Sequence, residues 1–67
     1  MAIVKVIEIL AQSEKGWEDA VNEAVAEASK TVDNIKSVYV KEFQTEVENN
    51  KVTAYRVNCK ISFLVQR

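Results

Sequence analysis

The stretch YRVNCKISFLVQ, residues 55–66, decides the fold because its side chains alternate between apolar and polar positions. Alternation with a period of two predicts a β-strand that buries one face and leaves the other open. The apolar positions are Tyr55, Val57, Cys59, Ile61, Phe63 and Val65. The other positions are Arg56, Asn58, Lys60, Ser62 and Gln66, with Leu64 as the one apolar exception. We expect this strand to span residues 51–66.

Two more strands are predicted on either side of a helical segment. Residues 3–10, IVKVIEIL, are β-branched and apolar on both faces, which is typical of a strand covered on both sides. Residues 35–47 predict a strand that joins residues 51–66 through the turn ENNK, where Asn49 and Asn50 tolerate positive φ. In a chain this small, the second cover of residues 3–10 is expected to be another subunit.

The segment between these strands predicts an amphipathic helix over residues 14–31. Ser13 is expected to cap it, and Glu14 suits the positive end of the helix dipole. The apolar stripe at helical spacing comprises Trp17, Ala20, Val21, Ala24, Val25, Ala28 and Val32. The opposite, acidic face comprises Glu14, Lys15, Glu18, Asp19, Glu23 and Glu27, which we interpret as a solvated surface.

The order β-α-β-β predicts an α+β fold formed by a single domain, residues 1–67. A right-handed crossover makes the first two strands parallel, and the hairpin reverses the third. With the third strand between the other two, the result is a three-stranded antiparallel sheet packed on one amphipathic helix. The sheet face away from the helix is expected to carry Ser37, Tyr39, Lys41 and Phe43 from one strand and Arg56, Asn58 and Lys60 from the next. This mixed aromatic, polar and basic surface is typical of a binding or assembly face.

Composition excludes several function classes. The net charge of −1 gives no reason to expect a nucleic-acid partner, and no apolar stretch is long enough to cross a bilayer. The N-terminal residues do not have the pattern of a signal peptide, and a single cysteine indicates a reducing compartment, so we expect a cytoplasmic protein. The chain has no histidine, the commonest general base and metal ligand, and we expect no enzyme activity.

Three segments together resemble the dodecin family: KVIEILAQSEKGWEDAVNEAV (5–25), TVDNIKSVYVKEF (31–43) and AYRVNCKISFLV (54–65). Dodecins are βαββ subunits that assemble as twelve into a hollow sphere with the helices outward. Many bind flavins in pairs at two-fold contacts, as storage or photoprotective traps rather than as enzymes. The resemblance therefore implies a homododecamer that binds and stores a small ligand.

The same resemblance places the flavin clamp at residues 37 and 56. In the family, a tryptophan of the second strand stacks on the flavin and a glutamine of the third strand holds it; here the residues are Ser37 and Arg56. Ser37 has no ring, and Arg56 has no acceptor for the flavin ring N–H. Weak or lost flavin binding is thus implied, as in a subgroup for one member of which calcium binding has been proposed. The ligand-binding residues we expect are Ser37, Tyr39, Arg56 and Asn58.

Several residues have alternative interpretations. Glu46 and Glu48 in TEVENN (45–50) could hold Ca²⁺ with carboxylates from symmetry-related subunits, although turn chemistry alone explains the asparagines. The basic set could bind an anionic or aromatic molecule or pair with Glu8, Glu42 or Glu46 of a neighbouring subunit; it comprises Lys36, Lys41, Arg56 and Lys60. Trp17 is interpreted as a core or interface plug, and Cys59 as a buried structural thiol.

Overall fold

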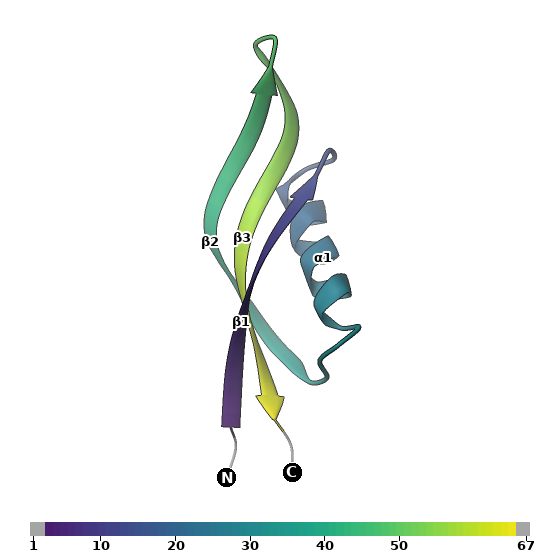
Figure 1. Ribbon diagram of the computed structural model, residues 1–67, viewed down its shortest axis with the longest axis vertical. Coiled ribbons are helices and arrows are strands. Elements are labelled where there is room, and N and C mark those ends of the chain that lie inside the picture. The colour runs from purple at the N-terminus through teal and green to yellow at the C-terminus, as the bar shows by residue number, and fades with distance from the viewer. Residues whose placement is uncertain (1–2, 66–67) are drawn as a thin grey trace.

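The computed structural model of the protein describes residues 3–65, which form three strands and one helix (Figure 1). The elements are β1 (Ile3–Ser13), α1 (Trp17–Ala28), β2 (Ile35–Glu48) and β3 (Lys51–Val65). The strands make one antiparallel sheet in the order β1-β3-β2. The α+β class, the β-α-β-β order and the central place of the third strand are confirmed. No helix among these residues is long and apolar enough to cross a membrane.

The core lies between α1 and the face of the sheet turned toward it. It consists of Ala20, Ala24 and Ala28 of α1 and Val57, Cys59 and Ile61 of β3. Alanines four residues apart lie on one side of the helix, and their small side chains let α1 approach the sheet closely. The alternation of residues 55–66 therefore correctly predicted the buried face of β3; Gln66 itself lies outside the described residues.

The helix is shorter than predicted at both ends, and Ser13 does not cap it. Ser13 is still paired with Tyr55 as the last residue of β1, so its backbone stays in the extended strand. Its buried hydroxyl donates to Asp19 Oδ2 at 2.6 Å and accepts from the Lys15 N–H at 2.9 Å. Gly16 is the N-cap residue and makes no side-chain bond. Ser13 thus links the end of β1 to the loop before α1 and, through the Asp19 side chain, to the first turn of the helix, without capping a backbone N–H of that turn.

The pairing of β2 with β3 shifts register between Val40 and Glu42, which changes the face of one aromatic residue. An extra residue in one strand reverses the alternation of the side chains that follow it. Phe43 consequently pairs with Val57 on the helix side of the sheet and contacts Trp17. The prediction that Phe43 lies on the face away from the helix is wrong.

The β2–β3 hairpin is long and extends past the helix, as its upper end in Figure 1 shows. Asn49 and Asn50 at its tip have φ of 52° and 64°, the two positive values of a tight hairpin turn. The predicted role of the asparagine pair is confirmed.

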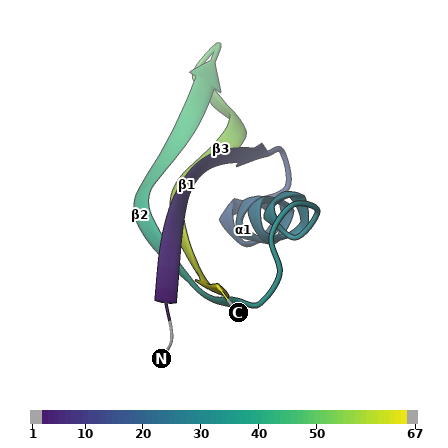
Figure 2. The same ribbon diagram turned by 60° about the horizontal axis from the view of Figure 1, so that its bottom comes forward.

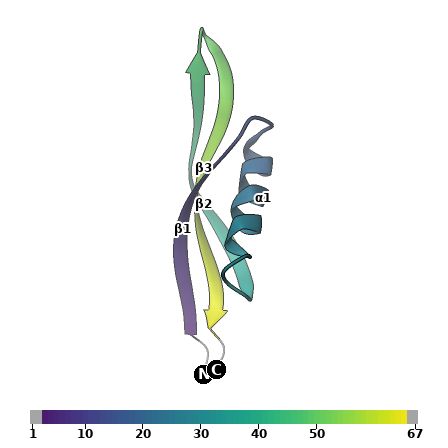
Figure 3. The ribbon, with the colours of Figure 1, turned by 45° about the vertical axis from the view of Figure 1, so that its right-hand side comes forward.

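The helix covers only one face of the sheet, and no element among residues 3–65 forms a second layer on the other face (Figures 2 and 3). Ile7, Ile9 and Ala11 of β1 pack against the core. The intervening apolar residues of β1 are exposed: Val4, Val6 and Leu10. The strand is therefore apolar on both faces, as predicted, and one of those faces stays open to solvent in the single chain.

Candidate ligand site on the open face

We call the sheet face away from α1 the open face. Three rows of paired residues, one from each strand, cross its centre. Arg56 lies between Gln12 and Gln44, Asn58 lies between Leu10 and Glu42, and Lys60 lies between Glu8 and Tyr39. Ser37 and Ser62 form the next row. The sheet thus gathers the predicted ligand residues Ser37, Tyr39, Arg56 and Asn58 on one surface.

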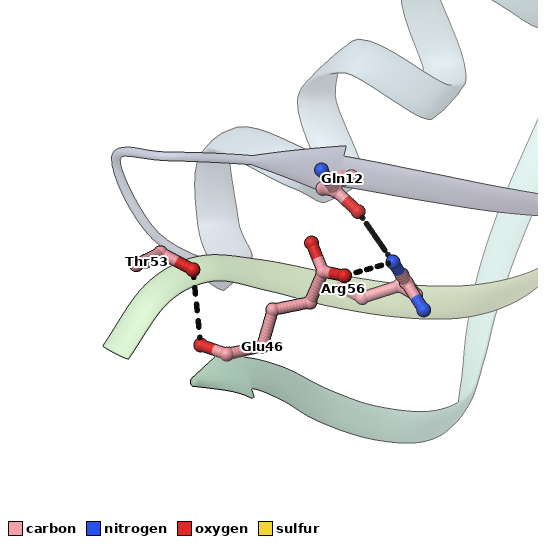
Figure 4. A network of polar contacts seen from close by, with 4 residues as sticks. All are labelled: Gln12, Glu46, Thr53 and Arg56. Atoms are coloured by element: carbon pink, nitrogen blue, oxygen red, sulfur yellow. Dashed lines mark hydrogen bonds and ion pairs between the residues drawn. The ribbon is translucent and has the colours of Figure 1, made fainter. Parts of the chain in front are cut away.

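Arg56 is held by side chains from both neighbouring strands (Figure 4). Its Nε and Nη2 groups donate to Gln12 Oε1 at 3.1 and 2.8 Å. Nη2 also lies 3.1 Å from Glu46 Oε2. Gln12 belongs to β1, Arg56 to β3 and Glu46 to β2, so this network ties the three strands together where the hairpin leaves the sheet.

The environment of Arg56 makes this ion pair stronger than one fully exposed to solvent. The Arg56 side chain is 26% exposed and that of Glu46 is 46% exposed, so water screens the pair only in part. The Thr53 hydroxyl donates to the Glu46 backbone carbonyl at 3.3 Å and adds a contact at the same point of the hairpin. Arg56 is therefore an oriented group with a compensated charge.

Sequence reasoning missed Gln12. Its role depends on the register of β1 against β3, which places it directly opposite Arg56 although the two are far apart in the chain. The signal in the sequence was that Gln12 lies four residues after Glu8 and therefore on the same face of the strand, if that strand continues past residue 10.

Ser37 occupies the position expected for the flavin-stacking ring. Its hydroxyl is hydrogen-bonded to the Ser62 hydroxyl across the β2–β3 pair, and the Ser62 hydroxyl also approaches the Ser37 carbonyl at 3.4 Å. Tyr39, two residues further along β2, is 66% exposed. The structure thus has a pair of small hydroxyls where a stacking surface would be needed.

Asn58 carries an unusual polar atom. Its Oδ1 is buried and has no hydrogen-bond partner among residues 3–65. An unsatisfied buried acceptor costs about 1–3 kcal/mol. Its neighbours in register are the apolar Leu10 on β1 and Glu42 on β2, neither of which donates to it.

Two of the basic residues have partners within the chain. Lys41 Nζ lies 3.7 Å from Glu8 Oε2, and Arg56 is paired with Glu46. The expected partners Glu8 and Glu46 are therefore used, but from the same subunit. The interpretation that these carboxylates pair with a neighbouring subunit is not needed for Lys41 or Arg56.

The predicted metal ligands do not form a cluster within one chain. Glu46 is engaged by Arg56, and Glu48 is the exposed last residue of β2. Across the described part of the chain, no three cysteine or carboxylate side chains come close enough to hold a metal ion. Because Ca²⁺ takes six to eight oxygen ligands, a site that used Glu46 and Glu48 would need ligands beyond these two side chains.

Trp17 and Cys59 lie on the helix side of the sheet, away from the candidate site. The Trp17 ring makes edge contacts with Phe43 and Tyr55 at centroid distances of 5.5 and 5.2 Å, and its indole N–H donates to the Gln44 carbonyl at 3.3 Å. Trp17 therefore packs the start of α1 against the hairpin, and its side chain stays partly exposed. Cys59 is buried, and burial raises the pKa of its thiol, which favours the unreactive protonated form.

Comparison with known proteins agrees with this architecture. The family model for dodecin matches residues 3–66, and the chain belongs to the dodecin family. It is 36% identical over 63 residues to the calcium dodecin of Mycobacterium tuberculosis, covering 94% of this chain and 89% of that protein.

Solved dodecin structures superpose closely on the chain. A mutant form of the Thermus thermophilus dodecin matches with a TM-score of 0.94 at 28% identity, covering all of both chains. The Streptomyces coelicolor dodecin matches with a TM-score of 0.93 at 26% identity, covering 98% of this chain and 94% of that one. The M. tuberculosis calcium dodecin, described as calcium-chelating with a novel calcium-binding site, matches with a TM-score of 0.82 at 35% identity, covering 96% and 91%. Dodecins are small binding proteins that bind flavins, and one relative of this chain is a calcium dodecin.

Proposed function

We propose that this chain is one domain that forms the subunit of a hollow homododecamer, a non-enzymatic cytoplasmic shell that binds and stores a small molecule. Membership of the dodecin family supports the assembly. The exposure of Val4, Val6 and Leu10 on a sheet face that α1 does not cover also supports it, because association would bury these side chains. We place the ligand on the open face, at Ser37, Tyr39, Arg56 and Asn58.

We further propose that flavin binding is weak or lost in this shell. The observation that carries this is the Gln12–Arg56–Glu46 network, which engages the residue that stands in place of the flavin-holding glutamine. Arg56 offers only donors and has no acceptor for the ring N–H of a flavin. Ser37 has no aromatic ring, so the site lacks the stacking energy of an aromatic pair. That energy is about 0.5–1.5 kcal/mol, in addition to the energy gained by burying apolar area.

The assembly is tested by native mass spectrometry and light scattering at micromolar concentration. We expect a dodecamer, and a stable monomer or dimer would contradict the proposal. Mass spectrometry of molecules that copurify with the native assembly would identify the ligand class.

The loss of flavin affinity is tested by titrating riboflavin and lumiflavin and following the quenching of their fluorescence. We expect little quenching at micromolar protein. Tight, stoichiometric quenching by the wild-type protein would show that Ser37 and Arg56 do not disable the site.

A calcium-binding shell is the second candidate, and the 36% identity to a calcium dodecin favours it. Glu46 and Glu48 would be ligands from one subunit, completed by oxygen atoms of other subunits. Calorimetric titration of the assembled protein with Ca²⁺ tests this, with Glu48→Gln expected to weaken binding at least tenfold. Glu14→Gln, which removes a carboxylate from the loop before α1, is the matched control. Equal affinities of both variants and the wild-type protein would exclude Glu48 as a ligand.

A further inference from the structure

The guanidinium of Arg56 has donors left after its contacts within the chain are made. Gln12 accepts from Nε and Nη2, and Glu46 lies against Nη2. The two N–H groups of Nη1 have no acceptor among residues 3–65. Figure 4 shows the Arg56 guanidinium between Gln12 and Glu46, with dashed lines from both residues to one of its nitrogens. Nη1 is therefore the part of the Arg56 guanidinium that remains able to donate to a ligand on the open face.

The charges around this amino group cancel. The central rows of the open face and the residues beside them carry three cations and three carboxylates: Lys41, Lys60 and Arg56, and Glu8, Glu42 and Glu46. Two of the cations lie within ion-pair distance of a carboxylate, at 3.1 Å for Arg56–Glu46 and 3.7 Å for Lys41–Glu8. An incoming ligand thus meets an oriented donor but no net positive field.

We propose that Gln12 and Glu46 are positioning residues that fix Arg56 and set the charge preference of the open-face site. With Arg56 held in this way, the site binds a neutral ligand that carries carbonyl oxygens in preference to an anionic ligand. The inference rests on the proposed ligand site and goes further by naming the chemical class of the ligand. A carbonyl oxygen accepts from Nη1 without needing a compensating charge. A phosphate or carboxylate at the same place is repelled by Glu46, and this repulsion offsets its attraction to Arg56.

Two flavins serve as matched probes, because riboflavin and FMN share one ring system and differ in a phosphate. Equilibrium dialysis at high protein concentration measures both affinities even where they are weak. For the wild-type protein we expect riboflavin to bind more tightly than FMN, because Glu46 repels the phosphate. Glu46→Gln leaves the Arg56 charge uncompensated, and we expect FMN to gain about tenfold over riboflavin at low salt and less at high salt.

Two further variants separate this role from bulk charge and from a purely structural role. Glu42→Gln removes the same charge from the same strand at a residue without an ion pair in the described part of the chain, and we expect a smaller change in the ratio. Gln12→Glu places a second carboxylate against Arg56, and we expect the ratio to move toward riboflavin. A residue that only stabilised the sheet would change both affinities together and leave their ratio constant.

Three results would overturn the inference. These are a strong wild-type preference for FMN, an equal shift for Glu46→Gln and Glu42→Gln, and no binding of either probe by any of the four proteins. The last result would agree with the proposed loss of flavin binding while removing Arg56 as a ligand contact. Light scattering on the same samples tests the shell separately. The ratio is compared only among samples that light scattering shows to be in the same assembly state, because the resemblance to dodecins places the site at two-fold contacts between subunits.

Discussion

Restoring the flavin clamp is the most direct perturbation of the open face. The double variant Ser37→Trp with Arg56→Gln introduces the stacking ring and the amide expected at these positions, and we predict a large gain in affinity for riboflavin. Ser37 is exposed on β2, so an indole there has room over the sheet surface. Arg56→Gln also removes the guanidinium that Gln12 and Glu46 hold across this surface.

The magnitude of this gain follows from the interactions that the two substitutions add and remove. Covering one face of the ring removes about 100 Å² of apolar surface from water, or about 2.5 kcal/mol. Stacking geometry adds about 0.5–1.5 kcal/mol, and one or two amide hydrogen bonds add about 1 kcal/mol each. Loss of the Ser37–Ser62 bond and reordering of the site oppose this gain, and we expect a net change of about 3 kcal/mol, or roughly 100-fold in affinity.

Quenching of riboflavin fluorescence measures the gain, with the two single variants completing a double-mutant cycle. Ser37→Trp alone should account for most of the gain, and Arg56→Gln alone for little, because the ring then has nothing to stack on. Tyr39→Trp is the matched control: it adds an indole to the same face but about 7 Å further along the strand. If the double variant stays assembled and binds no better than Tyr39→Trp, the assignment of residue 37 as the stacking position is refuted.

Three other predictions concern stability and reactivity. Trp17→Phe removes the indole hydrogen bond to the Gln44 carbonyl and part of the aromatic packing, and it should lower the free energy of unfolding by about 1 kcal/mol. Chemical denaturation followed by circular dichroism measures this change. An unchanged denaturation midpoint would contradict the role of Trp17 in holding α1 to the hairpin. Asn58→Leu removes the unsatisfied acceptor beside Leu10 and should leave the free energy of unfolding unchanged or raise it by about 1 kcal/mol. Asn58→Asp places a charge at the same position and should lower the thermal midpoint. A large loss of stability in Asn58→Leu would mean that the Asn58 Oδ1 has a partner in the assembly. Cys59 should resist iodoacetamide in the folded protein and react in denaturant, and rapid labelling of the native protein would contradict its burial. Burial raises the pKa of the Cys59 thiol in the folded state, so the unfolded thiol loses its proton first as pH rises. The free energy of unfolding should therefore fall as pH rises above about 9.

The sequence alone determined the elements and their order. Alternation in residues 55–66 marked the buried face of β3, alanines four apart marked the buried side of α1, and Asn49–Asn50 marked the hairpin turn. These signals are local, since each depends on the period of one element or on the backbone preference of one residue type. The ordered set of segments was also enough to indicate the dodecin family.

Only the tertiary structure decided which side chains meet. The register shift near Lys41 turned Phe43 to the helix side, and continued pairing of β1 kept Ser13 in the strand instead of at a helix cap. The same register brought Gln12 and Glu46 to Arg56 from two different strands. A bulge or a register is fixed by the packing of one strand against its neighbours, and no periodicity within a single strand reports it. The candidate site depends on such cross-strand contacts, so the sequence could place its residues on one face but could not show how they hold one another.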